Sequence, residues 1–237
     1  MSQPLDLSTD WHTHTTTSDG ANTIAEMVAA ATERGVARLH LTDHVRRDTT
    51  WLPDYVREVE RVRSQAPIEI VCGIEAKLLD VRGRLDAPAD RRGIEQVVIA
   101  DHQFPTRFGP VTPAEMRRRI DAAEVRVSDV IEDLCVSTSR AVFAADGVVV
   151  GHLFSVLPKA GIDVGEVPTE MLDLIARAVR DAGAVVEVSE KWRTPSLDMV
   201  GELCARGVEL VPASDAHTAD AIARWDHVLA AARRIVP

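Results

Sequence analysis

Residues 10–20 read Asp10-Trp11-His12-Thr13-His14-Thr15-Thr16-Thr17-Ser18-Asp19-Gly20. They follow a short apolar segment that predicts a strand over residues 7–12, and alternate residues at a strand end point to the same side. His12 and His14 can therefore face one cation, and the Ser-Asp-Gly turn can bring Asp19 back toward them. An apolar stripe with i, i+3, i+4 and i+7 spacing then predicts an amphipathic helix, with Asn22 as its N-cap.

This strand–helix unit recurs along the whole chain. Short apolar segments, often β-branched, predict strands at residues 7–12, 36–42, 68–74, 96–101, 147–151, 184–188 and 208–213. Amphipathic helices are predicted between most of them, including one long helix from Pro113 to about Ala145 and a late one over Ile222–Leu229. Gly35, Gly183 and Gly207 stand where helix C-caps are expected. Because no linker interrupts the alternation, we expect a parallel α/β barrel formed by a single domain over residues 1–237.

Composition excludes several classes of protein. The 237 residues carry a formal net charge of −10, which disfavours a dedicated nucleic-acid binder. The longest apolar runs, such as Val148–Val150, are too short to cross a bilayer. The start Met1-Ser2-Gln3-Pro4 has neither basic residues nor an apolar signal region, so we expect a cytoplasmic protein that is not secreted. Cys72, Cys135 and Cys204 lack Cys-x-x-Cys spacing, and we expect them to be buried free thiols.

Six of the eight histidines follow predicted strands at their carboxyl ends, together with acidic residues. The side chains at these strand ends are His12, His14, His44, Glu75, Asp101, His102, His152, Glu187, Asp215 and His217. Ligand sites of α/β barrels form at this one face, so the side chains should surround a single pocket. Imidazoles and carboxylates without thiolates suit Zn, Mn or Fe. His40 lies mid-strand and His227 on a late helix, and we expect both to be structural.

Cationic residues near the strand ends are candidates for binding phosphate. Lys191 and Arg193 follow the sixth predicted strand and could clamp a phosphate, with Arg193 offering the better fork geometry. Trp192 between them could stack on a substrate ring or pack under the barrel rim, and the sequence leaves both open. Arg107 and Lys159 lie on the two long loops, Phe104–Pro113 and Phe154–Pro168, and are expected to be solvated surface charges. Each loop could cover the site or be a surface excursion.

The motifs together resemble the polymerase and histidinol phosphatase (PHP) superfamily, a family of metal-dependent phosphoesterases. The resemblance extends from about Leu7 to Trp225 and rests on the order of six motifs: His-x-His, Thr-Asp-His, Gly-x-Glu, Asp-His, Gly-His and Asp-x-His. The stretch Gly73–Asp86 is also similar to bacterial members. The resemblance implies a distorted (β/α)7 TIM-like barrel with three divalent metal ions. Family members often have Glu-x-Asn where this chain has Glu187-Val188-Ser189, so substrate preference does not transfer.

The resemblance also implies a division of the ligands among the three ions. It assigns His12, His14, Glu75 and Asp215 to the first ion. Glu75 would bridge to a second ion that also takes His102 and His152, and the third would be bound by Asp19, His44 and His217. Asp215 and His217 again occupy alternate positions and could reach neighbouring ions.

The function predicted from these residues is hydrolysis of a small-molecule phosphate monoester, such as a histidinol-phosphate-like, nucleotide or sugar phosphate. The catalytic candidates are Glu75, Asp215, His217, Lys191 and Arg193. The first alternative is a phosphodiesterase or 3′-exonuclease acting on a nucleotide or small diester; the acidic charge and lack of a basic, aromatic groove argue against long nucleic acids. A second alternative is a non-catalytic metal-binding module, which the nine filled ligand positions disfavour. The expected partner is a small phosphate ester, and no membrane is expected to bind.

Overall fold

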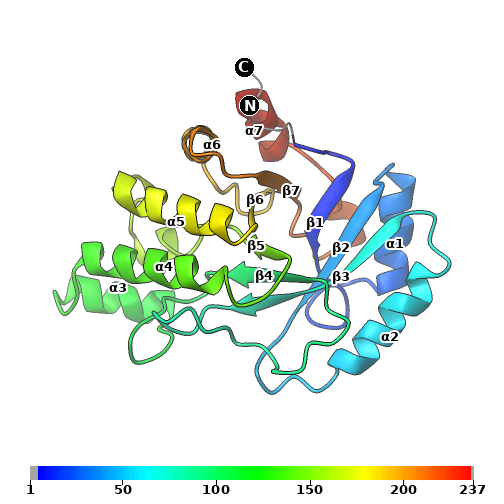
Figure 1. Ribbon diagram of the computed structural model, residues 1–237, viewed down its shortest axis with the longest axis horizontal. Helices are drawn as coiled ribbons and strands as arrows, with labels where there is room; N and C mark the ends of the chain where they lie inside the picture. Colours follow the sequence, from blue (N-terminus) through cyan, green and yellow to red (C-terminus); the bar gives the residue numbers. More distant parts are fainter. Residues whose placement is uncertain (1–4, 236–237) are drawn as a thin grey trace.

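Seven parallel strands form the centre of the molecule (Figure 1). The computed structural model describes residues 5–235, so the start on which the expectation about secretion rests lies outside the described residues. The strands are β1 Thr9–Thr13, β2 Arg38–His44, β3 Glu69–Lys77, β4 Gln96–Ala100, β5 Val148–Val150, β6 Val185–Ser189 and β7 Leu210–Ala213. Each pairs with the next in sequence, and Thr13 forms a parallel bridge to Ala216. The sheet is therefore a nearly closed barrel, which confirms the predicted distorted (β/α)7 fold.

Strand register places the polar strand ends beside one another. β2 and β3 pair without a shift from Arg38 opposite Glu69 to His44 opposite Glu75. The register between β1 and β2 shifts between Asp10 and Thr13. The strands are buried along most of their length, as expected for parallel strands covered on both faces. Their apolar residues form the core, and the carboxyl ends bring the polar residues to one mouth.

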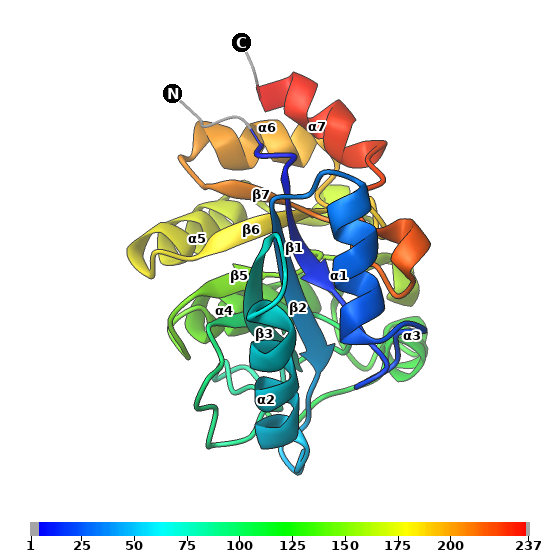
Figure 2. The same ribbon diagram turned by 90° about the vertical axis from the view of Figure 1, so that its right-hand side faces the viewer.

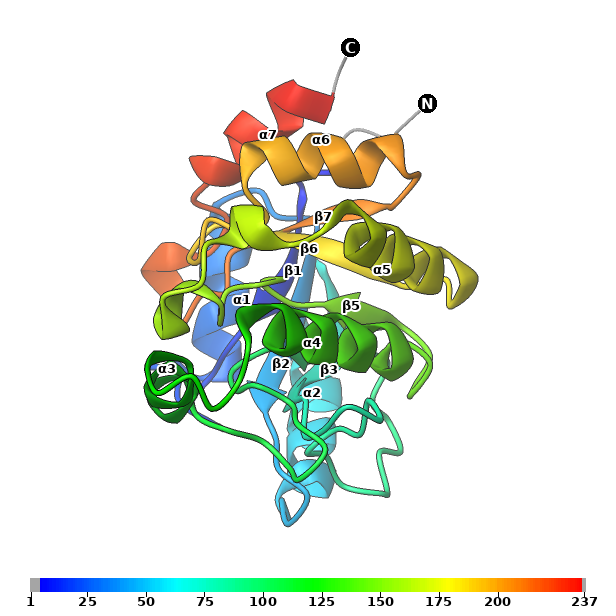
Figure 3. The same cartoon turned by 90° about the vertical axis from the view of Figure 1, so that its left-hand side faces the viewer.

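Helices cover the outside of the barrel. They are α1 Ile24–Glu33, α2 Leu52–Arg63, α3 Pro113–Asp121, α4 Val127–Ala141, α5 Thr169–Asp181, α6 Leu197–Ala205 and α7 His227–Ile235, with short 3-10 turns η1 Pro158–Ala160, η2 Val164–Glu166 and η3 Ala219–Ala221. Figure 2 shows α1 and α2 over the β1–β3 side, and Figure 3 shows α4 and α5 over the opposite side. Among the helices of residues 5–235, none has the length and apolarity needed to cross a membrane.

Two of the predicted helices have different bounds in the structure. The long helix predicted from Pro113 to about Ala145 is wrong, because the chain breaks it into α3 and α4. Ala123 adopts a left-handed φ of 55°, which ends α3 as a glycine would, although no glycine or proline marks the break. The late helix begins at His227 rather than Ile222, after Ala223 also takes a positive φ of 49°.

The helix caps follow the chemistry of their residues. The N-cap of α1 is Thr23, not the predicted Asn22, because Thr23 and Glu26 form a reciprocal capping box. Asn22 instead accepts a hydrogen bond from the amide of Ala219 at 2.9 Å. The predicted glycine C-caps are confirmed: Gly35, Gly183 and Gly207 follow the helix ends with φ between 62° and 73°.

His40 and His227 both pack away from the strand-end cluster. The His40 ring stacks on Trp11 with centroids 4.3 Å apart, and its Nδ1 hydrogen-bonds to Gln96. Burial lowers the pKa of His40 to about 4, so the ring is neutral. His227 Nε2 donates to the carbonyl of Pro195 at 2.9 Å. Both contacts support the expected structural roles.

The cysteines are free, and their accessibility can be tested directly. Cys72 and Cys135 are buried, and burial raises the pKa of each thiol to about 12. Cys204 is partly exposed, with its pKa also raised by burial. We expect an aromatic disulfide reagent at pH 8 to react with at most one thiol of the native protein and with all three after denaturation. Rapid reaction of all three in the native state would contradict this packing.

Candidate metal centre

Glu75, near the end of β3, is the centre of the polar cluster. Its carboxylate is buried, and five imidazoles surround it. The nearest nitrogens are His44 Nδ1 at 2.7 Å, His152 Nε2 at 3.0 Å, His102 Nε2 at 3.2 Å, His14 Nε2 at 3.4 Å and His12 Nε2 at 3.5 Å. These rings come from four different strand ends. The structure thus brings the sequence-predicted residues to one point at the barrel mouth.

A second group of donor atoms joins β1 to the end of β7. His12 Nε2 and His14 Nε2 face each other at 3.0 Å, and Asp215 Oδ1 lies 3.2 Å from His14 Nε2. Asp215 has a left-handed φ of 52°. This conformation is uncommon for residues other than glycine but is tolerated by aspartate. Such strain concentrates at functional sites, in agreement with a ligating role for Asp215.

The third group contains Asp19, whose side chain is 54% exposed. Asp19 Oδ1 lies 3.4 Å from His217 Nε2 and 3.8 Å from His14 Nδ1. Asp19 Oδ2 lies 3.4 Å from His44 Nε2. The Ser-Asp-Gly turn therefore returns Asp19 to the histidines, as its spacing predicted.

The donor atoms of the predicted ligands form overlapping groups. Three clusters have donor atoms close enough to hold an ion: His14, Asp19, His44 and His217; His12, His14 and Asp215; and His44, Glu75 and His102. His14 and His44 each belong to two clusters, and His152 contacts only Glu75 among the nine predicted ligands by its Nε2. All nine side chains meet at the mouth, whereas their division among three ions stays a prediction.

Two further carboxylates orient the histidines; both were predicted to line the pocket, but neither was assigned a ligand or catalytic role. Glu187 Oε2 lies 2.8 Å from His12 Nδ1, and Glu187 Oε1 accepts from the amide of His152 at 2.6 Å. Asp101 Oδ1 lies 3.0 Å from His152 Nδ1 and accepts from Ser155 Oγ at 2.7 Å. Carboxylates bound to the far nitrogen of a histidine fix its tautomer and orientation. Both residues stand at strand ends in the sequence, and this position was the one indication that they belong to the site.

Two buried aspartates hold the loops that carry the ligands. Asp43 accepts hydrogen bonds from Thr15 N at 2.9 Å and Thr15 Oγ1 at 2.8 Å, and from Ser18 N at 3.2 Å and Ser18 Oγ at 2.6 Å. This holds the turn that leads to Asp19. Asp10 accepts from Ser214 N at 2.9 Å and ties the chain before Asp215 to β1.

The electrostatics of the cluster suit a cation. Burial opposes ionisation of Glu75, but the charge of His12 and hydrogen bonds from His102, His12 and His152 hold its pKa well below the usual value. Burial likewise opposes charge on Asp215, yet His12 and His14 lower its pKa. Burial lowers the pKa of His14. Within residues 5–235, its buried Nδ1 has no hydrogen-bond partner. The donor set and this orphaned nitrogen fit a metal centre.

Of the two cationic residues after β6, Lys191 contacts the cluster and Arg193 does not. Lys191 Nζ lies 3.4 Å from Asp215 Oδ1 and 3.0 Å from His217 Nδ1. Trp192 Nε1 donates to Asp215 Oδ2 at 2.6 Å, so this indole belongs to the site. Arg193 is exposed, with φ 55°, and its side chain makes no hydrogen bond or ion pair with the described residues. The structure therefore brings Lys191 and Trp192 to the mouth but not Arg193.

The cationic residues of the two long loops also lie in different places. Lys159 Nζ lies 3.9 Å from the centroid of the Trp192 ring, so the Phe154–Pro168 loop reaches the mouth. This corrects the expectation that Lys159 is only a solvated surface charge. Nothing in the sequence around Lys159 indicated the contact with Trp192. Arg107 lies over the exposed Phe108 ring at 5.8 Å, at the tip of the other loop. Its expected place at the surface is confirmed.

The backbone under Asp19 leaves no room for a side chain at Gly20. A Cβ built there would lie 2.5 Å from the carbonyl oxygen of His14. We expect Gly20→Ala to push the turn off β1, lower the melting temperature and reduce bound metal per chain. The control is Gly201→Ala, because a Cβ at Gly201 meets only Arg234 Nε at 3.9 Å. Alanine should stabilise helix α6 there by about 1 kcal/mol. Unchanged melting and metal content in Gly20→Ala would contradict the role of the turn.

A model of the PHP domain family matches residues 10–191, well over half of the chain. The chain belongs to the PHP domain family. Among curated proteins it is 35% identical to a protein named probable phosphatase from Vibrio parahaemolyticus serotype O3:K6, over 115 residues. It is 32% identical to a probable phosphatase from Aliivibrio fischeri, over 116 residues. Each match covers 47% of this chain and 46% of the relative, so the matched part spans about half the length of these relatives.

A solved structure shares the fold of this PHP domain. It is the histidinol phosphate phosphatase from Lactococcus lactis subsp. lactis, complexed with zinc, L-histidinol and phosphate. The two chains superpose with a TM-score of 0.66 at 17% identity, over 96% of this chain and 92% of the other. The similarity extends over nearly the full barrel.

Proposed function

We propose that this PHP domain, over residues 1–237, is a metal-dependent phosphatase that hydrolyses a phosphate monoester of a small molecule. The observation that carries the proposal is the buried Glu75 carboxylate, surrounded by five imidazoles, at the barrel mouth where Lys191 contacts Asp215. We propose three divalent ions, Zn, Mn or Fe, divided among the nine ligands as the family resemblance implies. Histidinol phosphate, a nucleotide or a sugar phosphate are substrates of the proposed size.

The residues of the chain have separate tasks in this proposal. Divalent cations bound at the mouth supply an activated water at neutral pH and neutralise charge on the phosphoryl oxygens. Lys191, between Asp215 and His217, can donate to a phosphoryl oxygen that enters the mouth. Lys159 also lies against the Trp192 ring, with Nζ 3.9 Å from its centroid, and adds a second positive charge. The indole N–H of Trp192 holds the orientation of Asp215.

The comparisons support this reading of the site. The relatives from Vibrio and Aliivibrio are named phosphatases, and the Lactococcus structure holds zinc and phosphate in the same fold. An aromatic leaving group could stack near Trp192, which contacts His152 with ring centroids 5.7 Å apart. The free thiols Cys72, Cys135 and Cys204 fit a reducing compartment, and we propose that the protein acts in the cytoplasm.

A comparison of ester classes separates the monoesterase from the diesterase alternative. The cations at the mouth suit a terminal phosphoryl group with unsubstituted oxygens. We expect kcat/KM to be about a hundredfold higher for 4-nitrophenyl phosphate than for bis(4-nitrophenyl) phosphate, a difference of roughly 3 kcal/mol in transition-state binding. Faster turnover of the diester would support the phosphodiesterase instead.

The role of Glu187 behind His12 can be tested through metal affinity. Glu187→Gln keeps the shape of the side chain but removes the charge next to His12 Nδ1. We expect metal affinity to fall by about 10- to 100-fold, as is typical when the partner of a metal-binding histidine is removed. Competition with a chromophoric chelator measures the change, and Glu132→Gln on the exposed face of α4 is the control. Equal affinities in all three proteins would show that Glu187 has only a packing role.

A further inference from the structure

The distribution of lysines is unusual in this chain. There are 24 arginines but only three lysines, Lys77, Lys159 and Lys191. Lys159 and Lys191 lie against Trp192 at the mouth. Lys77 is the last residue of β3, two positions after Glu75, and alternate residues of a strand face the same side. All three lysines therefore lie at the ligand-binding end of the barrel.

Lys77 lines a cavity that opens beside the metal ligands. The cavity has a volume of about 460 Å³, and its wall includes His44, His102, Asp19, Arg46, Lys77 and Trp51. Thr49 Oγ1 accepts a hydrogen bond from the amide of Arg46 at 2.8 Å and fixes the backbone of that residue. The lining thus combines proposed metal ligands with two cations and an aromatic ring.

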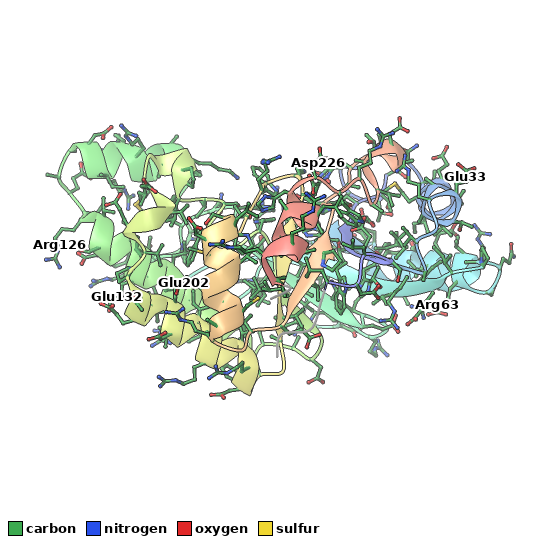
Figure 4. All side chains as sticks on the ribbon, turned by 90° about the horizontal axis from the view of Figure 1, so that it is seen from above. Glu33, Arg63, Arg126, Glu132, Glu202 and Asp226 are labelled. Carbon is green, nitrogen blue, oxygen red and sulfur yellow. The ribbon has the colours of Figure 1, made fainter. Side chains whose placement is uncertain are left out.

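The two cations of this cavity are unpaired. Within residues 5–235, the side chains of Arg46 and Lys77 make no hydrogen bond or ion pair. Some peripheral arginines are paired: Arg63 pairs with Glu60 and Arg126 with Asp129, both on the outer helices seen in Figure 4. The carboxylate that lines the cavity, Asp19, is already engaged by His44 and His217. The cavity therefore presents two positive charges that make no ion pair with the described residues.

We infer that this cavity binds a second acidic group on the leaving-group side of the substrate, a carboxylate or a further phosphate. The inference rests on the proposed phosphatase function. Lys159 and Lys191 belong to the segments that follow β5 and β6, whereas Arg46 follows β2 and Lys77 ends β3. A monoester with its phosphoryl group at the metal ligands would extend its leaving group into the cavity. Arg46 and Lys77 would then bind the acidic group, and Trp51 would contact the apolar part between the two charges.

Charge-matched substrates test this inference. The neutral probe is the phosphate monoester of methyl 4-hydroxybenzoate, and the acidic probes are 4-carboxyphenyl phosphate and 1,4-phenylene bisphosphate. We expect wild-type protein to prefer an acidic probe by about tenfold in kcat/KM, the size expected for one charge-assisted contact. Lys77→Gln and Arg46→Gln should each remove most of this preference, chiefly through a higher KM for the acidic probe. The better of the two acidic probes identifies the second group as carboxylate or phosphate.

Arg177→Gln is the matched control, because Arg177 is an exposed arginine of α5 without a hydrogen bond or ion pair to described residues. This variant should retain the wild-type preference, and thermal unfolding of each variant confirms folding. Equal kcat/KM for acidic and neutral probes in the wild type would overturn the inference while leaving the phosphatase function intact. Equal losses on both kinds of probe in Lys77→Gln and Arg46→Gln would also overturn it. No turnover of any probe would contradict the proposed function itself, and the inference with it.

Discussion

Replacing Glu75 with Gln is expected to reduce turnover of 4-nitrophenyl phosphate by at least about a thousandfold, since the metal-dependent route is lost. The substitution keeps the shape of the side chain but removes the negative charge at the centre of the cluster. Five imidazoles then face an amide instead of a carboxylate. Steady-state kinetics at saturating Zn, Mn or Fe measure the loss.

The matched control is Glu33→Gln, an exposed residue of α1 that lies at the periphery in Figure 4. It should keep wild-type kinetics. Circular dichroism and thermal unfolding distinguish a loss of chemistry from a loss of structure in Glu75→Gln. Wild-type turnover in a folded Glu75→Gln protein would contradict the proposed site.

Removing divalent ions should have the second large effect. Without cations, the buried carboxylates of Glu75 and Asp215 are compensated by the surrounding histidines and, at Asp215, by Lys191 and the indole N–H of Trp192. A ligand at a thousand times its Kd stabilises the folded state by about 4 kcal/mol. In a chain of this size that corresponds to a melting temperature roughly 10 °C higher. We therefore expect a chelator to lower the melting temperature by about this amount and to abolish hydrolysis.

Adding back one metal at a time identifies which ion the centre uses. Zn, Mn and Fe are each added to chelator-treated protein, and both the melting temperature and hydrolysis are measured. Recovery of both is the expected result for at least one of the three. An unchanged melting temperature after complete metal removal, verified by elemental analysis, would contradict a centre built on Glu75 and Asp215.

The strand ends were the part of the molecule that could be predicted best. A parallel barrel brings every carboxyl strand end to one face, so His12, Glu75 and Asp215 had to converge once the strands were recognised. The residues that orient them were harder to assign. The sequence places Asp101 and Glu187 at strand ends without assigning them a role, and only the hydrogen bonds to His152 and His12 show that they act behind the rings.

Local backbone conformation limited the prediction elsewhere. The break between α3 and α4 depends on a left-handed Ala123, a residue with high helix propensity that no local rule would select. Lys159 was assigned to the surface because a loop sequence does not specify where its tip folds. The 3-10 turn η1 that contains this residue brings it to Trp192. Arg193 was predicted to clamp phosphate, but its side chain is exposed and makes no hydrogen bond or ion pair with the described residues.

The central claim is that the cluster around Glu75 binds divalent ions and a phosphoryl group together. A crystal structure of the zinc-loaded protein soaked with inorganic phosphate, with anomalous data at the zinc edge, tests it most directly. We predict three anomalous peaks at the barrel mouth, one of them on Glu75, with phosphate beside Lys191. Zinc absent from Glu75, or phosphate bound away from the ions, would contradict the account.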